Sequence, residues 1–241
     1  MHSKVELIDG LDDGILARRV AVDWLDEIEK ADHNSIEYRV ALSGGRSAER
    51  FFSAVSELAR LRSVSFDKVR FFWSDERCVP PTDAESNFAL ANRLLLQPLG
   101  IRADHIHRLK GEIDPCEAAE QAEVELRRIS PSRSVGLPLL DLVFLGLGED
   151  GHIASLFPQA QREVVESRAF FLPIVGPKPP PNRITMTYAA IAAASRVWVL
   201  ASGVGKDEAL TASLSSETRT PLGHLLRLRS STRIYTTWTS R

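Results

Sequence analysis

Short apolar runs alternate along the chain with longer stretches in which apolar residues recur at helical spacing. In the stretch 12–30, Ala17, Ala21 and Trp24 would lie on one face of a helix. The stretch 139–145 is almost wholly apolar, as expected of a strand buried on both faces of a parallel sheet. The pattern predicts strands at residues 4–8, 36–42, 69–73, 105–109, 139–145, 170–175, 183–188, 197–201 and 234–238. It predicts helices at residues 12–30, 47–61, 86–96, 115–128 and 206–214.

Two of the predicted helices carry a capping signal. Ser86 opens one of them, and Asp114 followed by Pro115 opens another. Because strands and helices alternate along the chain, we expect an α/β fold with a mostly parallel central sheet and helices on both of its faces. The proline cluster at 173–181 is followed at once by a strand, so it reads as a rigid loop rather than a linker. The sequence therefore predicts a single domain over residues 1–241.

Charge and composition narrow the choice of partners. The chain of 241 residues has 30 basic and 32 acidic residues and a formal net charge of -2, so no global positive field could hold nucleic acid or an anionic membrane. Any anionic ligand must be bound by a local cluster. Residues 1–10 carry acids where a signal peptide has its apolar core, and no stretch is long and apolar enough to cross a membrane. We therefore expect a soluble, cytoplasmic protein.

The two cysteines, Cys78 and Cys116, form no disulfide framework and match no zinc spacing. A reducing compartment is the simplest interpretation. Neither a metal site nor a cofactor is expected.

Ligands of open α/β sheets bind beyond the carboxyl ends of the strands, and unusual residues follow several predicted strands here. The first such stretch is 43–47, with the sequence Ser-Gly-Gly-Arg-Ser. Its two glycines let the backbone approach a ligand, the helix that follows offers free N–H groups, and Arg46 adds positive charge. An ordinary tight turn would explain the same residues equally well. The stretch is not a Walker loop, because the lysine and the spacing are missing.

The second stretch places three charged residues, Asp75, Glu76 and Arg77, directly after an apolar strand. Arg77 could bind a carboxylate or stabilise a developing oxyanion. The alternative is an ion-pair cluster that only closes the loop. This stretch alone favours a functional role moderately over a structural one.

The third stretch contains a literal G-x-G-x-x-G at Gly146, Gly148 and Gly151, so a dinucleotide site has to be considered. The motif is weak by itself, and no second strand ends in an acidic residue where ribose binding would need one. His152 follows the glycine loop directly. Asp150, two residues earlier, could orient its ring or raise its basicity, which favours a catalytic over a structural histidine.

The fourth stretch supplies two further cations. Arg183 follows the proline loop, and Lys206 opens a predicted helix. Each alone would be a surface cation, but together with the loop 43–47 they could form a phosphate pocket. The remaining histidines have no motif around them and are expected to be structural or exposed: His2, His33, His105, His107 and His224.

At these four stretches the chain resembles the 6-phosphogluconolactonase family, within the larger group that includes the glucosamine-6-phosphate deaminases. Residues 146–158 match Gly-x-Gly-x-Asp-Gly-His-x-Ala-Ser-Leu-Phe-Pro, and the resemblance covers nearly the whole chain in order. Two departures stand out. The chain has Ser47-Ala48 where the family usually has Thr-Pro, and residues 229–241 lack the family's usual ending. The resemblance implies a modified Rossmann-like fold.

The resemblance further implies hydrolysis of 6-phospho-D-glucono-1,5-lactone to 6-phosphogluconate in the oxidative pentose phosphate pathway, without metal. His152 would be the general base toward water, Asp150 would orient it, and Arg77 would stabilise the oxyanion or hold the sugar. Substrate and phosphate would be bound by Ser43, Gly44, Gly45, Arg46, Asp75, Arg183 and Lys206. The alternatives are an isomerase or deaminase of an amino-sugar phosphate and a non-catalytic sugar-phosphate sensor. A monomer or small homo-oligomer is expected, with no nucleic-acid or membrane partner.

Overall fold

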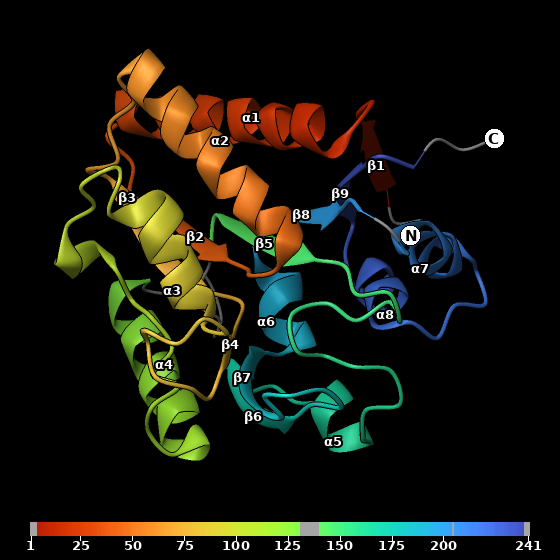
Figure 1. Ribbon diagram of the computed structural model, residues 1–241. Helices are drawn as coiled ribbons and strands as arrows, with labels where there is room; N and C mark the ends of the chain where they lie inside the picture. Colours follow the sequence, from red (N-terminus) through yellow and green to blue (C-terminus); the bar gives the residue numbers. More distant parts are fainter. Residues whose placement is uncertain (1–3, 131–139, 204, 239–241) are drawn as a thin grey trace.

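The computed structural model describes residues 4–130, 140–203 and 205–238. Its centre is a six-stranded sheet in which every pair of neighbouring strands is parallel (Figure 1). In spatial order the strands are β1 (Lys4–Asp9), β9 (Ser231–Thr236), β8 (Arg196–Ala201), β5 (Leu142–Gly146), β2 (Tyr38–Leu42) and β3 (Val69–Trp73). The prediction of a mostly parallel central sheet is confirmed.

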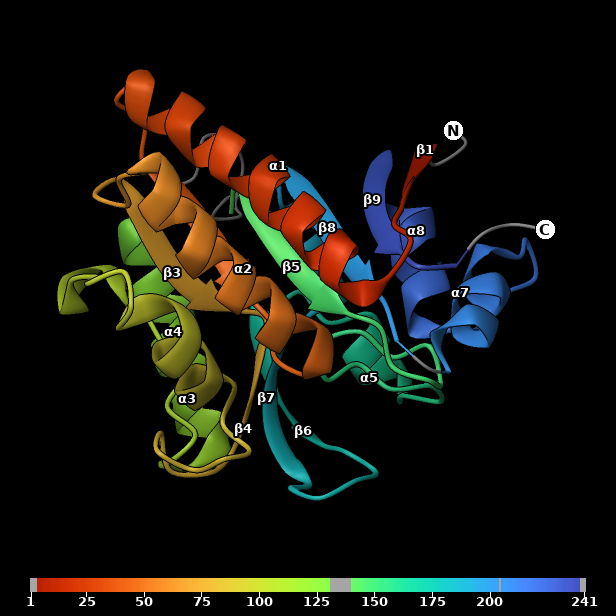
Figure 2. The same ribbon diagram turned by 45° about the horizontal axis from the view of Figure 1, so that its top comes forward.

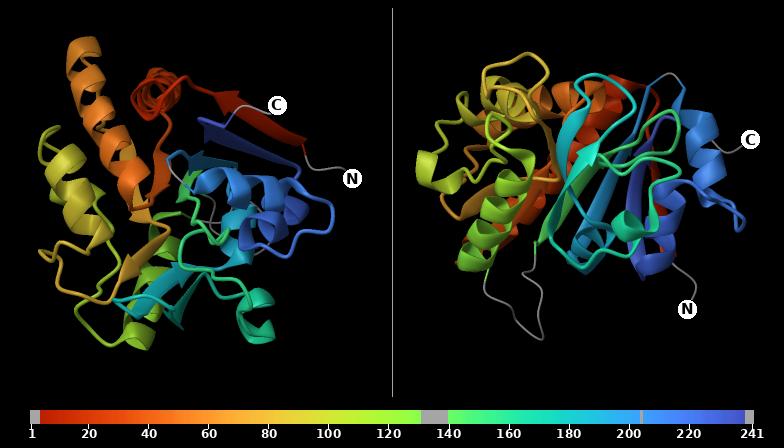
Figure 3. Two further views of the ribbon diagram at one scale, coloured as in Figure 1. Left: turned by 45° about the vertical axis from the view of Figure 1, so that its right-hand side comes forward. Right: turned by 90° about the horizontal axis from the view of Figure 1, so that it is seen from below.

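Helices lie on both faces of this sheet (Figures 1 and 3). Helices α1 (Asp13–His33) and α2 (Arg46–Arg62) cover one face, while α6 (Tyr188–Ala193) and α8 (Pro221–Leu228) lie on the other. On the first face, Trp24 of α1 and Phe51 of α2 pack against Phe144 of β5, with ring centroids 5.2 and 4.7 Å away. All three side chains are fully buried, so this aromatic cluster fixes the two helices over the middle of the sheet.

A second, antiparallel sheet of three strands lies beyond the carboxyl ends of β3 and β5 (Figure 2). Its order is β4 (Asp75–Arg77), β7 (Asn182–Met186) and β6 (Phe171–Val175). The sequence predicts β6 and β7 as strands but does not separate them from the central sheet, because an apolar run specifies a strand and not its neighbour. It misses β4, whose three residues are all charged.

The predicted helix starts are confirmed. Ser86 Oγ accepts a hydrogen bond from Ala89 N at 3.1 Å, which caps α3 (Asn87–Ala91), and the chain continues as a π-helical turn over Asn92–Leu96. Asp114 caps α4 (Pro115–Ile129) in the same way. Helix α7 (Lys206–Leu214) has the predicted bounds. Helices α5 (Arg162–Val165), α6 and α8 were not predicted. The first two are too short to display a helical period, whereas α8 carries an apolar face and begins with Thr220 and Pro221, signals that the sequence analysis missed.

The strand predicted at 105–109 is wrong. Residues Ala103–His105 form a 3₁₀ turn, and only Ile106 bridges to Phe71 of β3 before the chain turns away toward α4. The predicted strand 139–145 begins at a residue outside the described ranges, and its described part is β5. Cys78 and Cys116 are both free. Within the described ranges, the chain contains no helix with the length and hydropathy needed to span a membrane.

Candidate active site

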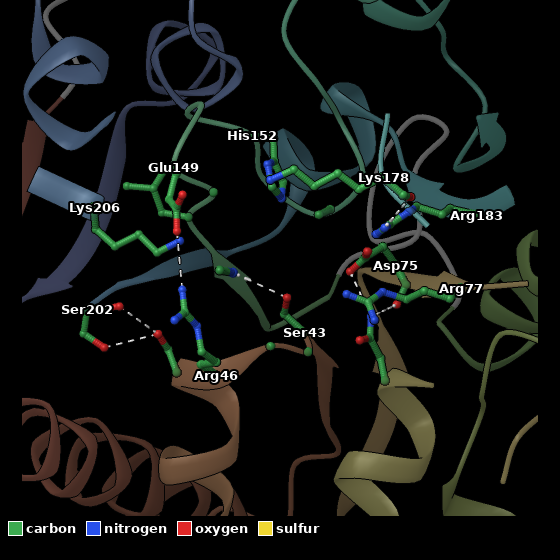
Figure 4. Close-up of a pocket in the computed structure, with 18 residues that line it drawn as sticks. Ser43, Arg46, Asp75, Arg77, Glu149, His152, Lys178, Arg183, Ser202 and Lys206 are labelled. Atoms are coloured by element: carbon green, nitrogen blue, oxygen red, sulfur yellow. Dashed lines mark hydrogen bonds and ion pairs between the residues drawn. The ribbon is translucent and has the colours of Figure 1, made fainter. Parts of the chain in front are cut away.

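A cleft of about 270 Å³ opens beyond the carboxyl ends of β2 and β5 (Figure 4). From β2 the chain crosses to β3 on one side, and from β5 it crosses to β8 on the other, so the topology of the sheet reverses between these two strands. Such a reversal leaves a crevice in which open α/β sheets bind ligands. Gly146 N donates a hydrogen bond to Ser43 Oγ at 3.4 Å, which joins the two loops at the floor of the cleft.

The loop 43–47 presents the start of α2 to this cleft. Gly45 has φ +90° and no side chain caps the helix, so the N–H groups of its first turn are free to bind an anion. Gly44 is required by contact, because a Cβ at this position would lie 1.8 Å from Asn87 Oδ1. Gly45 thus allows the turn into α2 and Gly44 leaves room for the Asn87 side chain, while the binding of a ligand by this loop stays a prediction.

The loop after β5 holds His152 at the edge of the cleft. Asp150 Oδ1 lies 2.5 Å from His152 Nδ1 and also accepts a hydrogen bond from His152 N at 3.1 Å. The ring packs against Phe157 with centroids 4.9 Å apart. Burial opposes ionisation of Asp150, but the hydrogen bonds from His152 outweigh it and hold the pKa of this carboxyl below its usual value. The pair fixes the ring and leaves Nε2 without a partner among the described residues.

Glycine at position 148 is also part of this arrangement. A Cβ at Gly148 would lie 1.9 Å from His152 Nδ1, so only glycine leaves room for the ring. No helix follows the loop directly, since α5 begins at Arg162. A dinucleotide site would need a helix N-terminus there for the pyrophosphate. Gly148 of the motif accommodates His152 and Gly151 lies against Thr220 instead, so the dinucleotide interpretation is rejected.

Two guanidinium groups face each other across the small sheet. Arg77 of β4 and Arg183 of β7 are directly paired in the antiparallel register. Arg183 is only 7% exposed and donates to the carbonyls of Pro180 and Lys178. Burial, and then the charge of Arg77, lower the pKa of Arg183. Like charges at opposed positions of a sheet repel each other, so an anion bound between them would relieve the repulsion.

Asp75 and Glu76 have different environments although they are adjacent. Asp75 Oδ2 accepts from Ser155 Oγ at 2.7 Å and its Oδ1 accepts from Asn87 Nδ2 at 3.3 Å, at the wall of the cleft. The Glu76 carboxylate is turned away and accepts from the backbone N–H groups of three residues and from one hydroxyl, namely those of Arg77, Asn87, Phe88 and Ser86. Burial raises the pKa of Glu76, and these hydrogen bonds partly offset it. Glu76 therefore organises the start of α3 and plays no part in the cleft.

On the other side of His152 in Figure 4 lies a second group of charges. Lys206 is the first residue of α7, and Arg46 NH2 lies 3.4 Å from Glu149 Oε1. Burial lowers the pKa of Lys206, and the nearby Glu149 carboxylate only partly offsets this. The cleft is lined by five cationic side chains, those of Arg46, Arg77, Lys178, Arg183 and Lys206. Its acidic lining residues are Asp75 and Glu149.

All but one of the predicted site residues line this one cleft: Ser43, Gly44, Gly45, Arg46, Asp75, Arg77, His152, Arg183 and Lys206. Asp150 lies behind His152 and reaches the cleft only through it. The sequence analysis did not select several other lining residues, among them Asn87, Glu149, Lys178 and Ser202. Glu149 and Lys178 stand within stretches that it singled out, so their charge was a usable signal. Asn87 directly follows the capping residue Ser86 and so also lay within a recognised stretch, whereas Ser202 carried no signal.

The sequence model that describes glucosamine-6-phosphate isomerases and 6-phosphogluconolactonase matches residues 12–235. The chain belongs to this family. A 6-phosphogluconolactonase of Treponema pallidum is 36% identical over 178 residues, which cover 74% of this chain and 72% of that protein. The solved structure of a 6-phosphogluconolactonase from Trypanosoma brucei aligns with a TM-score of 0.84 at 26% identity, over 97% of each chain.

The fold of the family is shared more widely than these two proteins. The structure of a monomeric glucosamine-6-phosphate deaminase aligns with a TM-score of 0.81, over 96% of both chains, but at only 18% identity. A likeness at that identity concerns the fold alone. The choice between family activities therefore depends on the cleft and on the more similar relatives.

Proposed function

We propose that this protein is a cytoplasmic 6-phosphogluconolactonase, which hydrolyses 6-phospho-D-glucono-1,5-lactone to 6-phosphogluconate. The observation that carries the proposal is the cleft, in which five cationic side chains surround a His152–Asp150 pair although the whole chain has a net charge of -2. A surplus of positive charge suits a phosphorylated substrate, and a fixed imidazole suits proton transfer. The lactonases among the similar proteins support the same assignment.

In the proposed reaction His152 Nε2 removes a proton from water, and the water oxygen bonds to the lactone carbonyl carbon. The tetrahedral oxyanion is stabilised by the Arg77 guanidinium, whose Nε is buried without a partner among the described residues. Collapse of the intermediate breaks the bond between this carbon and the ring oxygen, and the protonated His152 returns its proton to that oxygen. Asp150 holds the ring in place throughout. A lactone is an activated ester, so these groups suffice without a metal ion.

His152 is a better base than Asp75, the other titratable group of the wall. Each carboxylate oxygen of Asp75 already accepts a hydrogen bond, from Asn87 and from Ser155. His152 Nε2, in contrast, has no partner among the described residues and is available to a water molecule. We assign Asp75 to substrate positioning, because its contacts with Asn87 and Ser155 hold it in place at the wall of the cleft.

The phosphate is assigned to the start of α2. Free N–H groups of the loop 43–47 and the side chains of Arg46 and Lys206 lie at this end of the cleft, and Arg183 faces them from the other side of the cleft, beside Arg77. Binding energy from a phosphate that does not react would hold the lactone beside His152.

The decisive experiment compares lactones with and without the phosphate. Purified protein should accelerate the opening of freshly generated 6-phosphogluconolactone far more than that of glucono-1,5-lactone, because only the first occupies the cationic end of the cleft. Rates are followed by base uptake at constant pH and corrected for spontaneous opening. Equal acceleration of both lactones would contradict the phosphate assignment. Release of ammonia from glucosamine-6-phosphate would establish the deaminase alternative.

Loss of a phosphate-binding cation should affect binding more than chemistry. Arg183→Ala and Lys206→Ala are each expected to raise KM by about 10- to 100-fold with little change in kcat, because a charge-assisted contact made in ground and transition states alike is lost. Steady-state kinetics measures both constants. The matched control is Arg162→Ala, at a side chain that is 81% exposed and pairs with Glu166 outside the cleft. A fall in kcat at constant KM would instead place Arg183 or Lys206 at the reacting carbonyl.

A further inference from the structure

Glu149 is an acidic residue in the cationic end of the cleft. Its Oε1 lies 3.4 Å from Arg46 NH2, and Figure 4 shows the end of the Lys206 side chain beside the line that joins these two groups. The Lys206 ammonium forms no hydrogen bond or ion pair with any residue that the structure describes. The charge that acts most strongly on Lys206 is that of Glu149. One carboxylate thus pairs with Arg46 and partly offsets the charge of Lys206 from beyond ion-pair distance.

The backbone keeps Glu149 in this place. A Cβ at position 205 would lie 3.0 Å from Glu149 Cγ, so the side chain packs against the glycine turn that starts α7. Gly205 has φ +80°, a conformation that glycine adopts without strain. Glu149 is therefore seated between the starts of two helices, α2 and α7, whose first residues are Arg46 and Lys206.

A phosphate group needs the same donors as this carboxylate. Carboxylate and phosphate oxygens both accept hydrogen bonds from guanidinium and ammonium groups, and two anions held by one pair of cations repel each other. We propose that Glu149 is an internal anion that competes with the phosphate of the ligand for the cationic end of the cleft, at Arg46 and Lys206, and is displaced by that phosphate. The inference rests on the proposed position of the phosphate at Arg46 and Lys206.

Competition between Glu149 and the phosphate would help the product to leave the cleft after each turnover. After hydrolysis the product still carries its phosphate, and a carboxylate that competes for Arg46 and Lys206 weakens the hold on it. Because the phosphate contacts are the same before and after the reaction, Glu149 weakens substrate and product binding alike and leaves the chemical step unchanged. Glu149 therefore lowers the affinity of the cleft for substrate and product and speeds the release of the product.

The test is Glu149→Gln, which keeps the size of the side chain and removes its charge. Isothermal titration should show 6-phosphogluconate and inorganic phosphate binding about threefold to tenfold more tightly than to the unaltered protein, the range expected of one partly exposed charge. Gluconate, which lacks the phosphate, should bind as before. In about 0.5 M salt the gain should shrink, because screening weakens interactions between exposed charges.

Two further variants complete the test. Glu149→Asp keeps the charge and should bind phosphate nearly as the unaltered protein does. Glu120→Gln removes an exposed carboxylate of α4, away from the cleft, and should change nothing. If Glu149→Gln binds phosphate no more tightly than the unaltered protein, the inference is overturned. Weaker binding would show in addition that Glu149 holds Arg46 and Lys206 in position for the phosphate. If the protein lacks lactonase activity but Glu149→Gln still tightens inorganic phosphate, the proposed function fails and the inference stands.

Discussion

Replacing His152 with asparagine is expected to lower kcat by about 10²- to 10⁴-fold, the usual contribution of a general base. Asparagine can still accept a hydrogen bond in the loop, but it cannot take a proton from water. The lactonase assay measures kcat, and titration with 6-phosphogluconate measures binding, which should change little.

The control for this variant is His33→Asn, at an exposed histidine in the last turn of α1. It should keep full activity. A His152 that only organises its loop would behave differently: its replacement would lower thermal stability and product affinity together. A folded His152→Asn protein with undiminished kcat would remove His152 from the mechanism.

Gly148→Ala should be almost as damaging, although it adds a single methyl group. The new Cβ would lie 1.9 Å from His152 Nδ1, so the ring has to move by more than 1 Å and lose its alignment with Asp150. Misplacement of a reacting group by about 1 Å can cost on the order of 10²-fold in rate. Crowding of this kind lowers the free energy of unfolding by about 1–3 kcal/mol, which leaves the protein folded. Activity assays and thermal unfolding separate the two effects.

The matched control is Gly100→Ala. Gly100 has φ +63° but no heavy atom within 4 Å of the Cβ site, so alanine there costs about 1 kcal/mol of backbone strain and no contact. It should lower stability modestly and leave the rate unchanged. If Gly148→Ala lost no more activity than Gly100→Ala, the space beside the His152 ring would have no catalytic importance.

Local chemistry explains which parts of the fold could be predicted. Ser86 and Asp114 mark helix starts because their side chains bond the first N–H groups of the same helix, and both contacts are made within three residues. The assignment of β6 and β7 to a second sheet depends on pairing with β4, more than a hundred residues from β7 in the chain. No periodicity carries such information. The strand predicted at 105–109 has the right composition but meets only one partner residue, Phe71.

In the cleft, too, features within one stretch of sequence could be predicted, and contacts between distant stretches could not. Loops that carry unusual residues next to strand ends could be recognised, and nearly all of the site residues predicted from them line one pocket. The roles of neighbours could not be separated: Glu76 and Asp75 are adjacent, yet one caps α3 and the other braces the wall. Asn87 was missed because its importance arises from the contact with Gly44, which exists only once β2 and α3 are packed.

The pairing of β1 with β9 sets the order in which a growing chain can complete the sheet. β1 contacts the central sheet only through β9, and Arg233 and Glu6, which form an ion pair between them, are 227 positions apart. During synthesis β1 can therefore join the central sheet only after β9 has left the ribosome. The strands β2, β3, β5 and β8, and every proposed site residue up to Lys206, come earlier and can pair before then. The cleft belongs to the part of the chain that can assemble first, and β1 closes the edge of the sheet afterwards.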